Sequence, residues 1–172
     1  MNNLQPLYSE TNLLSDQQRI DLIKARLAII GDNPYFEVKI KPLTESEIKT
    51  INPDLPKSHL DFLQQIGTLY VVGFGWNLIH TYIPTPWEES HGPGGESLGY
   101  SKIKAEPNTY ICVACGVQGE YYGYNTTTKP FEFFETDFSE FNPVKCDQDS
   151  FLGVVEANLD YHLDEINKLS AL

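Results

Sequence analysis

The Cys112-Val-Ala-Cys115-Gly run has the spacing most suggestive of chemistry in this chain of 172 residues. Thiolates three residues apart can supply half of a zinc site, or a redox pair when they open a helix. A zinc site needs two more ligands at short spacing, and only the distant Cys146 and four scattered histidines remain. The apolar flanks predict a strand, where positions three apart point to opposite faces. We therefore expect core thiols with no metal and no disulfide between them, while zinc and redox chemistry stay open as alternatives.

Neither the histidines nor the glycine-rich runs complete a catalytic or cofactor-binding pattern. The four histidines, which have no H-E-x-x-H spacing, are His59, His80, His91 and His162. Residues 73–75 follow a predicted strand but lack the third glycine and the helix that a dinucleotide site needs. Residues 92–95 lack the following Lys-Ser or Lys-Thr of a phosphate-binding loop. We therefore expect no cofactor and no enzyme activity.

Acidic and aromatic residues are concentrated in two segments that suit contact with a partner. Trp87 lies among acids in a loop rich in Pro and Gly, over residues 84–99. A solvated loop, a metal or acid–base site, and a binding surface with an aromatic anchor are the readings open here. Residues 131–141 have five Phe among acids, too many for all to point inward. The candidate partner-binding residues are Trp87, Glu88, Glu89, Glu96, Tyr121, Glu135, Asp137 and Glu140.

The formal net charge of −12 excludes some classes of partner. Such a field repels nucleic acid and anionic membranes, since binding to either needs basic patches. It attracts basic proteins and accelerates their capture. We therefore expect a basic protein partner, no nucleic acid and no membrane, with solubility alone as the other reading of the charge.

Targeting signals and cysteine usage bear on the compartment. The chain begins without the basic and apolar segments of a secretory leader, and its apolar runs are far too short to span a bilayer. Three cysteines are an odd count and too few for a disulfide scaffold. These features favour a reduced, cytoplasmic protein.

Apolar periodicity and capping motifs predict the elements that position these residues. Helices are expected near residues 15–30, 44–51, 56–66 and 151–168, with capping boxes at Ser15 and Thr44 and a loose leader before them, over residues 1–14. Extended segments are predicted at residues 35–41, 69–83, 109–117, 120–125 and 131–138. Helices, then strands, then a helix predict one α+β domain over residues 1–172. We expect a mainly antiparallel sheet with N-terminal helices and a C-terminal helix packed on it.

One stretch of the chain also resembles a known family. Residues 43–67 read LTESEIKTINPDLPKSHLDFLQQIG, a capped helix, then Leu-Pro and a short amphipathic helix ending in Gly. An apolar strand pair, the hairpin ICVACGVQGEYYGYN and a Ser-Phe start to a last helix follow. This succession, over about residues 43–157, resembles the SUKH superfamily, which includes bacterial immunity proteins and a fungal regulator of cell-wall synthesis. The resemblance implies an α+β sheet fold and, for bacterial members, neutralisation of a toxin by direct binding.

Charge, the incomplete catalytic patterns and the resemblance together lead to a functional hypothesis. We expect a non-catalytic immunity protein that binds a basic toxin domain, for instance a nuclease. A regulatory or scaffold module of the same fold, in cell-envelope or signalling complexes, is the alternative, and an enzyme with an unrecognised site is a third reading. The sequence does not indicate an oligomeric state.

Overall fold

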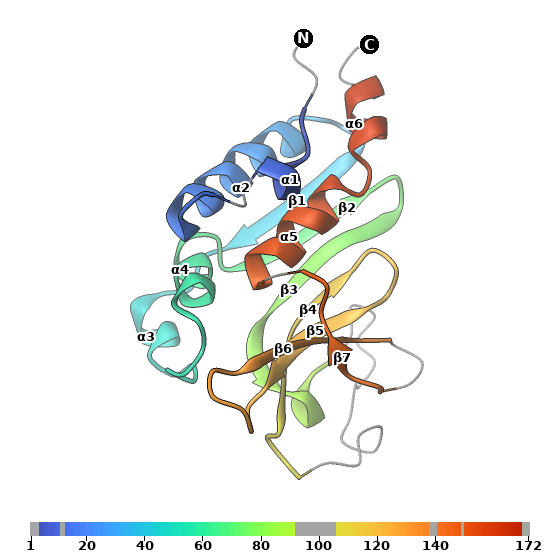
Figure 1. Ribbon diagram of the computed structural model, residues 1–172. Coiled ribbons are helices and arrows are strands. Elements are labelled where there is room, and N and C mark those ends of the chain that lie inside the picture. Colours follow the sequence, from blue (N-terminus) through green and yellow to red (C-terminus); the bar gives the residue numbers. More distant parts are fainter. Residues whose placement is uncertain (1–3, 11–12, 92–105, 138–140, 149, 170–172) are drawn as a thin grey trace.

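The structure is a computed structural model that describes residues 4–10, 13–91, 106–137, 141–148 and 150–169. Its centre is a sheet of seven strands, in which neighbours in space are also neighbours in sequence and every pair is antiparallel (Figure 1). The strands are β1 (Phe36–Lys41), β2 (Thr68–Gly73), β3 (Trp76–Pro86), β4 (Tyr110–Gly116), β5 (Tyr121–Asn125), β6 (Glu132–Thr136) and β7 (Val144–Lys145). The predicted α+β class with a mainly antiparallel sheet is confirmed.

Helices begin where the capping residues predicted them. The helices are α1 (Leu7–Glu10), α2 (Asp16–Gly31), α3 (Glu45–Ile48), α4 (Lys57–Gln65), α5 (Phe151–Asp160) and α6 (Leu163–Leu169), with a short 3-10 helix, η1 (Trp87–Glu89). Ser15 and Gln18 form the expected capping box of α2, and Thr44 and Glu47 form that of α3. None of the helices in the described residues is long and apolar enough to cross a bilayer.

The two ends of the described chain pack against each other, which corrects one prediction. Residues 4–10 are not a loose leader: Leu7 is buried, and α1 packs on α5. The Leu4 amide donates to Asn167 Oδ1 at 2.8 Å, and Asn167 Nδ2 donates back to the Leu4 carbonyl at 3.2 Å. The C-terminal helix, predicted as one, is divided into α5 and α6 by Tyr161 and His162.

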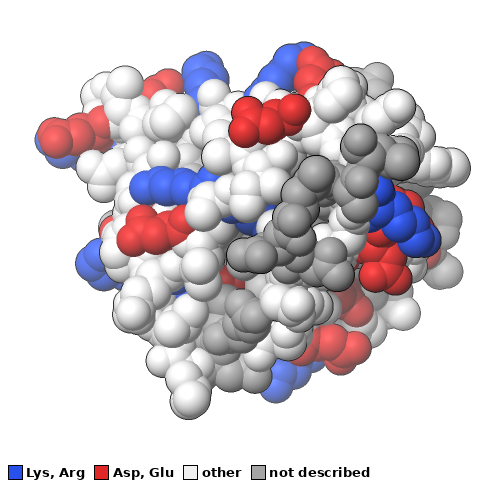
Figure 2. Space-filling view, turned by 90° about the horizontal axis from the view of Figure 1, so that it is seen from above, with Lys and Arg blue, Asp and Glu red and all other residues white. Residues whose placement is uncertain are grey.

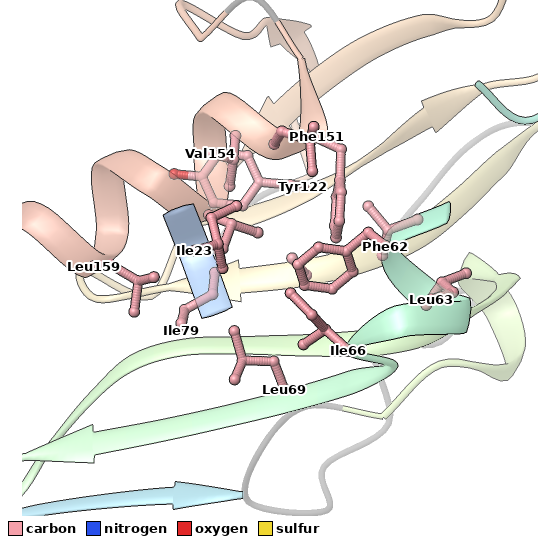
Figure 3. Close-up of a cluster of buried hydrophobic side chains, with 14 of the residues drawn as sticks. Ile23, Phe62, Leu63, Ile66, Leu69, Ile79, Tyr122, Phe151, Val154 and Leu159 are labelled. Carbon is pink, nitrogen blue, oxygen red and sulfur yellow. The ribbon is translucent and has the colours of Figure 1, made fainter. Parts of the chain in front are cut away.

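The main core lies between the helices and one face of the sheet (Figures 1 and 3). Figure 3 shows side chains from α2, α4 and α5 meeting those of the sheet around Phe62 and Phe151. The Phe151 ring meets Phe62 edge to face at 5.0 Å between centroids and stacks on His59 at 3.7 Å. This packing fixes the helices to the sheet and so sets which surfaces remain for function.

Two buried arginines tie α2 to α5 within this layer. Arg19 donates from Nε and Nη2 to the two carboxylate oxygens of Glu156, at 3.0 and 2.8 Å. Arg26 Nη1 lies 3.1 Å from Asp160 Oδ1. Glu156 is fully buried, so the acids of the C-terminal helical segment do not all lie on a solvated face.

Candidate partner-binding surface

Trp87 and Tyr121, both predicted to contact a partner, lie side by side in the interior. Their rings meet edge to face with centroids 5.8 Å apart, and each residue is 2 % exposed. They belong to a second cluster, with Cys112, Cys115 and Phe134, which is separate from the core under the helices. Strand β3 continues to Pro86, so the loop expected from residue 84 starts later than predicted. Trp87 directly follows the strand, and its side chain packs on the sheet. Trp87 is therefore buried in the single chain and does not present an aromatic anchor on its surface.

The acids next to Trp87 keep contact with solvent. Glu89 is exposed and Glu88 is partly buried. Glu88 Oε1 accepts a hydrogen bond from the Asn108 amide at 2.8 Å, which ties η1 to the segment before β4. Glu96 lies outside the described residues. Glu88 and Glu89 therefore add negative charge to this side of the molecule, while the ring of Trp87 beside them is buried.

The Glu135 side chain of β6 points away from the Trp87 cluster. Adjacent residues of a strand face opposite sides of the sheet, and Phe134 packs in the Trp87 cluster. Glu135 thus faces the helix side, where it accepts a hydrogen bond from Cys146 Sγ at 3.5 Å. Asp137 is exposed, and Glu140 lies outside the described residues. Those predicted site residues that the structure describes are therefore divided between the two faces of the sheet and do not form one surface.

A β-bulge changes the geometry of the two spaced thiols. Cys112 pairs with Gly123, whereas Ala114, two residues on, pairs with the adjacent Tyr122. The extra residue restores a common direction, so Cys112 and Cys115 lie in the same cluster. The expectation that they point to opposite faces is wrong, although both are buried and free, as core thiols are.

The chemistry of this face is that of protonated thiols and a neutral imidazole. Burial raises the pKa of Cys112 well above its ordinary range and that of Cys115 to about 11. Cys115 Sγ accepts from Asn77 Nδ2 at 3.4 Å, and burial lowers the pKa of His80. Among the described residues, His, Cys, Asp and Glu side chains do not gather into a group that could hold a metal ion. Neither thiol has the low pKa of an activated nucleophile.

The exposed aromatic side chains gather elsewhere, at the end of the β2–β3 hairpin. Within the described residues, the large aromatic side chains that are clearly exposed are Tyr35, Phe74, Trp76 and Tyr161. Phe74 lies next to His162, with ring centroids 6.2 Å apart, and His162 meets Tyr161 at 4.7 Å. Trp76 is the most exposed of the four, at 66 %. We call these four residues with His162 the aromatic tip; Figure 1 shows the hairpin end near the α5–α6 junction.

The hairpin turn holds Phe74 in an unusual backbone conformation. Phe74 has φ 54° and Gly75 has φ 80°, the pair of positive values typical of a type I′ turn. Gly, Asn and Asp tolerate this region, whereas a bulky side chain is strained there. Strained residues of this kind concentrate at functional sites, because stability alone would replace them.

Aromatic contacts hold the Phe74 ring in place despite the strain. It stacks on Tyr35 at 6.2 Å between centroids and meets Phe36 edge to face at 5.1 Å. A Cβ atom on Gly73 would lie 2.2 Å from the Phe36 ring, so only glycine leaves room for Phe36 there. The tip is therefore a preorganised surface, whose shape does not have to form when a partner arrives.

Carboxylates border the aromatic tip on the helix side. Tyr161 and His162 line a surface hollow of about 550 Å³ together with Pro6, Asp160, Leu163, Asp164 and Glu165. Glu165 Oε2 lies 3.7 Å from His162 Nδ1. The tip thus presents aromatic faces next to negative charge, a combination that suits Lys and Arg side chains of a partner.

Comparisons of the chain with family models, curated proteins and solved structures gave no match.

Sequence reasoning passed over the aromatic tip. In the sequence, residues 73–75 fit only an incomplete dinucleotide-binding pattern, in which the Phe between the two glycines has no role. The available signal was a tight turn between two apolar strands with an aromatic residue where Asn or Gly is usual. Tyr161 gave no comparable signal, because it is exposed only through the division of the C-terminal helix.

Proposed function

We propose that this protein is a non-catalytic binding protein that captures a basic protein partner through the aromatic tip. Following the sequence resemblance, the partner is a bacterial toxin domain, which binding neutralises. The observation that carries the proposal is Phe74, an aromatic side chain kept 39 % exposed at a strained turn position. Such a residue costs stability, so binding is the most direct reason for its presence.

The composition of the tip matches that of energetically dominant interface residues. Trp and Tyr are enriched among the side chains whose truncation weakens binding most. They contribute large contact areas with few rotatable bonds, so little conformational entropy is lost on docking. Trp76 and Tyr161 have both properties and project from a rigid sheet and a helix junction.

The net charge supports a basic partner by its long-range action. The field of a chain with net charge −12 accelerates the approach of a positive protein. In the view of Figure 2, acidic side chains lie singly over the surface, several next to a Lys or Arg, and do not form one patch. Because the acids are scattered, they act through the overall field, which steers a basic partner toward the protein. The aromatic tip supplies the docking contacts.

The chemistry of the buried groups is consistent with binding as the function. Cys112 and Cys115 are protonated at neutral pH because burial raises their pKa values. His59 is fully buried and its pKa is lowered to about 3, so it is neutral as well. Neutral side chains of this kind can be buried without an uncompensated charge, so these residues stabilise the interior.

The test is binding kinetics against the toxin domain encoded beside this protein's gene. Trp76→Ala is expected to raise the dissociation rate by roughly thirtyfold, which corresponds to about 2 kcal/mol at a dominant contact. Ile83→Ala is the matched control, because Ile83 is an exposed apolar residue of the same strand, seven positions from Trp76 and outside the tip. Its kinetics should match those of the unmodified chain.

Steering is tested separately through charge and salt. Reversal of Glu88 and Glu89 to Lys should slow association while leaving dissociation nearly unchanged, and the difference should shrink as salt rises. If Trp76→Ala binds like Ile83→Ala, the tip is not the contact surface. If no toxin gene lies nearby and the chain binds no basic domain, the immunity role fails as a whole.

A further inference from the structure

Strand β1 is an edge of the sheet that has the features of a pairing surface. It pairs with β2 over six residues without a bulge, and the described part of the chain places no strand on its other side. Natural edge strands are commonly shortened, bulged or interrupted by Pro, which prevents pairing with another chain. β1 has none of these three devices.

The hydrogen-bonding direction of β1 follows from two main-chain contacts. The Tyr35 carbonyl accepts from the Phe74 amide, in register with the β1–β2 pairs. The Leu69 amide, opposite Ile40, donates away from β1 to a side chain of β3. Hydrogen bonding alternates along an antiparallel strand, so the main-chain groups of Val38 and Ile40 point outward. An outward pair of amide and carbonyl groups therefore lies at the middle of β1.

The side chains of β1 are self-complementary in one antiparallel register. A two-fold axis at Val38 places Glu37 opposite Lys39 of the second copy on both sides of the axis. An axis at Glu37 or at Lys39 would bring that residue opposite its own copy, and an axis at Ile40 would bring Lys39 opposite Lys41. Opposite charges stabilise a cross-strand pair and like charges destabilise it. Of these axes, only the one at Val38 brings opposite charges together, so the charge pattern favours the register centred on Val38.

Apolar residues and local charge favour the same register. The axis at Val38 places Phe36 opposite Ile40 of the second copy, and Ile40 is 46 % exposed in the single chain. β1 has two Lys and one Glu, a local charge of +1 in a chain of net charge −12. Pairing through β1 therefore joins two chains of high negative charge at a segment whose own charge is slightly positive.

We infer that the chain forms a homodimer through antiparallel pairing of β1 with β1 of a second copy, with the axis at Val38. The Val38 residues exchange hydrogen bonds across the axis, and each Ile40 amide donates to the Phe36 carbonyl opposite. The two sheets become one continuous sheet. This dimer does not depend on the aromatic tip having a partner, because its contacts are those of β1 alone.

Sedimentation velocity on the full chain over a range of concentrations tests the dimer. A pairing surface of one short strand is small, so a dissociation constant in the micromolar range is expected. Glu37→Lys and Lys39→Glu each turn both cross-strand pairs from attractive to repulsive, and each should weaken dimerisation by about tenfold or more. The double variant Glu37→Lys/Lys39→Glu restores opposite charges and should dimerise like the unmodified chain.

Mixing gives a sharper readout of the register. Glu37→Lys has two Lys where Lys39→Glu has two Glu, so an equimolar mixture should form heterodimers although each variant alone is monomeric. Hydrogen exchange at the Val38 and Ile40 amides should slow as the unmodified chain dimerises. A chain that is monomeric up to about 300 µM overturns the inference. So does equal dimerisation of all variants, or a double variant and a mixture that remain monomeric.

Discussion

The ring of Phe74 stacks on that of Tyr35, with 15° between the ring planes, while the Phe74 backbone stays at φ 54°. The stacking offsets part of the cost of a backbone conformation that few side chains tolerate. Function and stability therefore make different demands on this residue.

Substitution of Phe74 separates backbone strain from loss of the ring. Phe74→Asn and Phe74→Ala both remove the ring contacts, but Asn tolerates a positive φ and Ala does not. We expect Phe74→Asn to be more stable than Phe74→Ala by about 1 kcal/mol in urea unfolding. Equal stability of the two variants would mean that the turn relaxes. In either case both should lose affinity for the partner.

Truncation of the two tryptophans is expected to change the unfolding free energy by very different amounts. Trp87→Ala removes a ring that is 2 % exposed and should cost about 3–5 kcal/mol of unfolding free energy. Trp76→Ala changes an exposed surface and should stay within about 0.5 kcal/mol. Fluorescence of the variants with one tryptophan provides a second check: iodide should quench Trp76 and leave Trp87 bright. Similar quenching would mean that Trp87 is accessible in solution.

His59 links stability to pH. Its ring is fully buried, with Nδ1 3.1 Å from the Tyr124 hydroxyl, and burial lowers its pKa from 6.5 to about 3. Between those values the unfolded chain binds a proton at this position and the folded chain does not. Stability is therefore lost as pH falls below 6.5, by about 1.4 kcal/mol per pH unit for one group.

His59→Phe isolates this contribution, because Phe can keep the stacking on Phe151 and does not titrate. The difference in unfolding free energy between the two proteins should change across pH 6.5 to 4 in favour of the variant. Carboxylates that titrate in this range are common to both proteins and cancel. A constant difference would show that His59 binds its proton in the folded protein as readily as in the unfolded chain.

The buried pair of Arg19 and Glu156 predicts a large cost when one partner is neutralised. Glu156→Gln removes the carboxylate charge that faces the buried guanidinium of Arg19 at 2.8 Å, which should cost about 3–5 kcal/mol. Asp61→Asn in the pair with Lys57 is the control, since Lys57 is largely exposed, and it should stay below about 1 kcal/mol. Urea unfolding of both variants at neutral pH measures the two costs. Similar values would mean that Arg19 finds another acceptor or water.

Local chemistry explains which parts of the fold were predictable. Ser15 and Thr44 begin their helices as expected, because a capping box is made by residues three apart. The tight turns of β2–β3 and β4–β5 make neighbours in the sequence neighbours in the sheet. Each of these features depends on neighbours in the sequence, which a single sequence displays directly.

The candidate site depended on tertiary contacts that the sequence does not display. Trp87 looked like an exposed anchor because its neighbours are acids, yet its ring packs on Tyr121 across the sheet. The bulge that aligns Cys112 with Cys115 is set by pairing with β5, and strand alternation alone predicted the reverse. Packing of the Trp87 ring in the first case, and pairing of β4 with β5 in the second, determined the outcome, and local composition did not.

The order of the sheet has a consequence for synthesis on the ribosome. Each strand pairs with the strand made just before it, so the sheet can grow one strand at a time. Helix α2 is made early, but its two buried arginines meet their carboxylates only when α5 has been made. A nascent chain that stops before residue 150 is thus expected to hold a sheet whose apolar face is uncovered where α5 packs, the kind of surface that chaperones recognise.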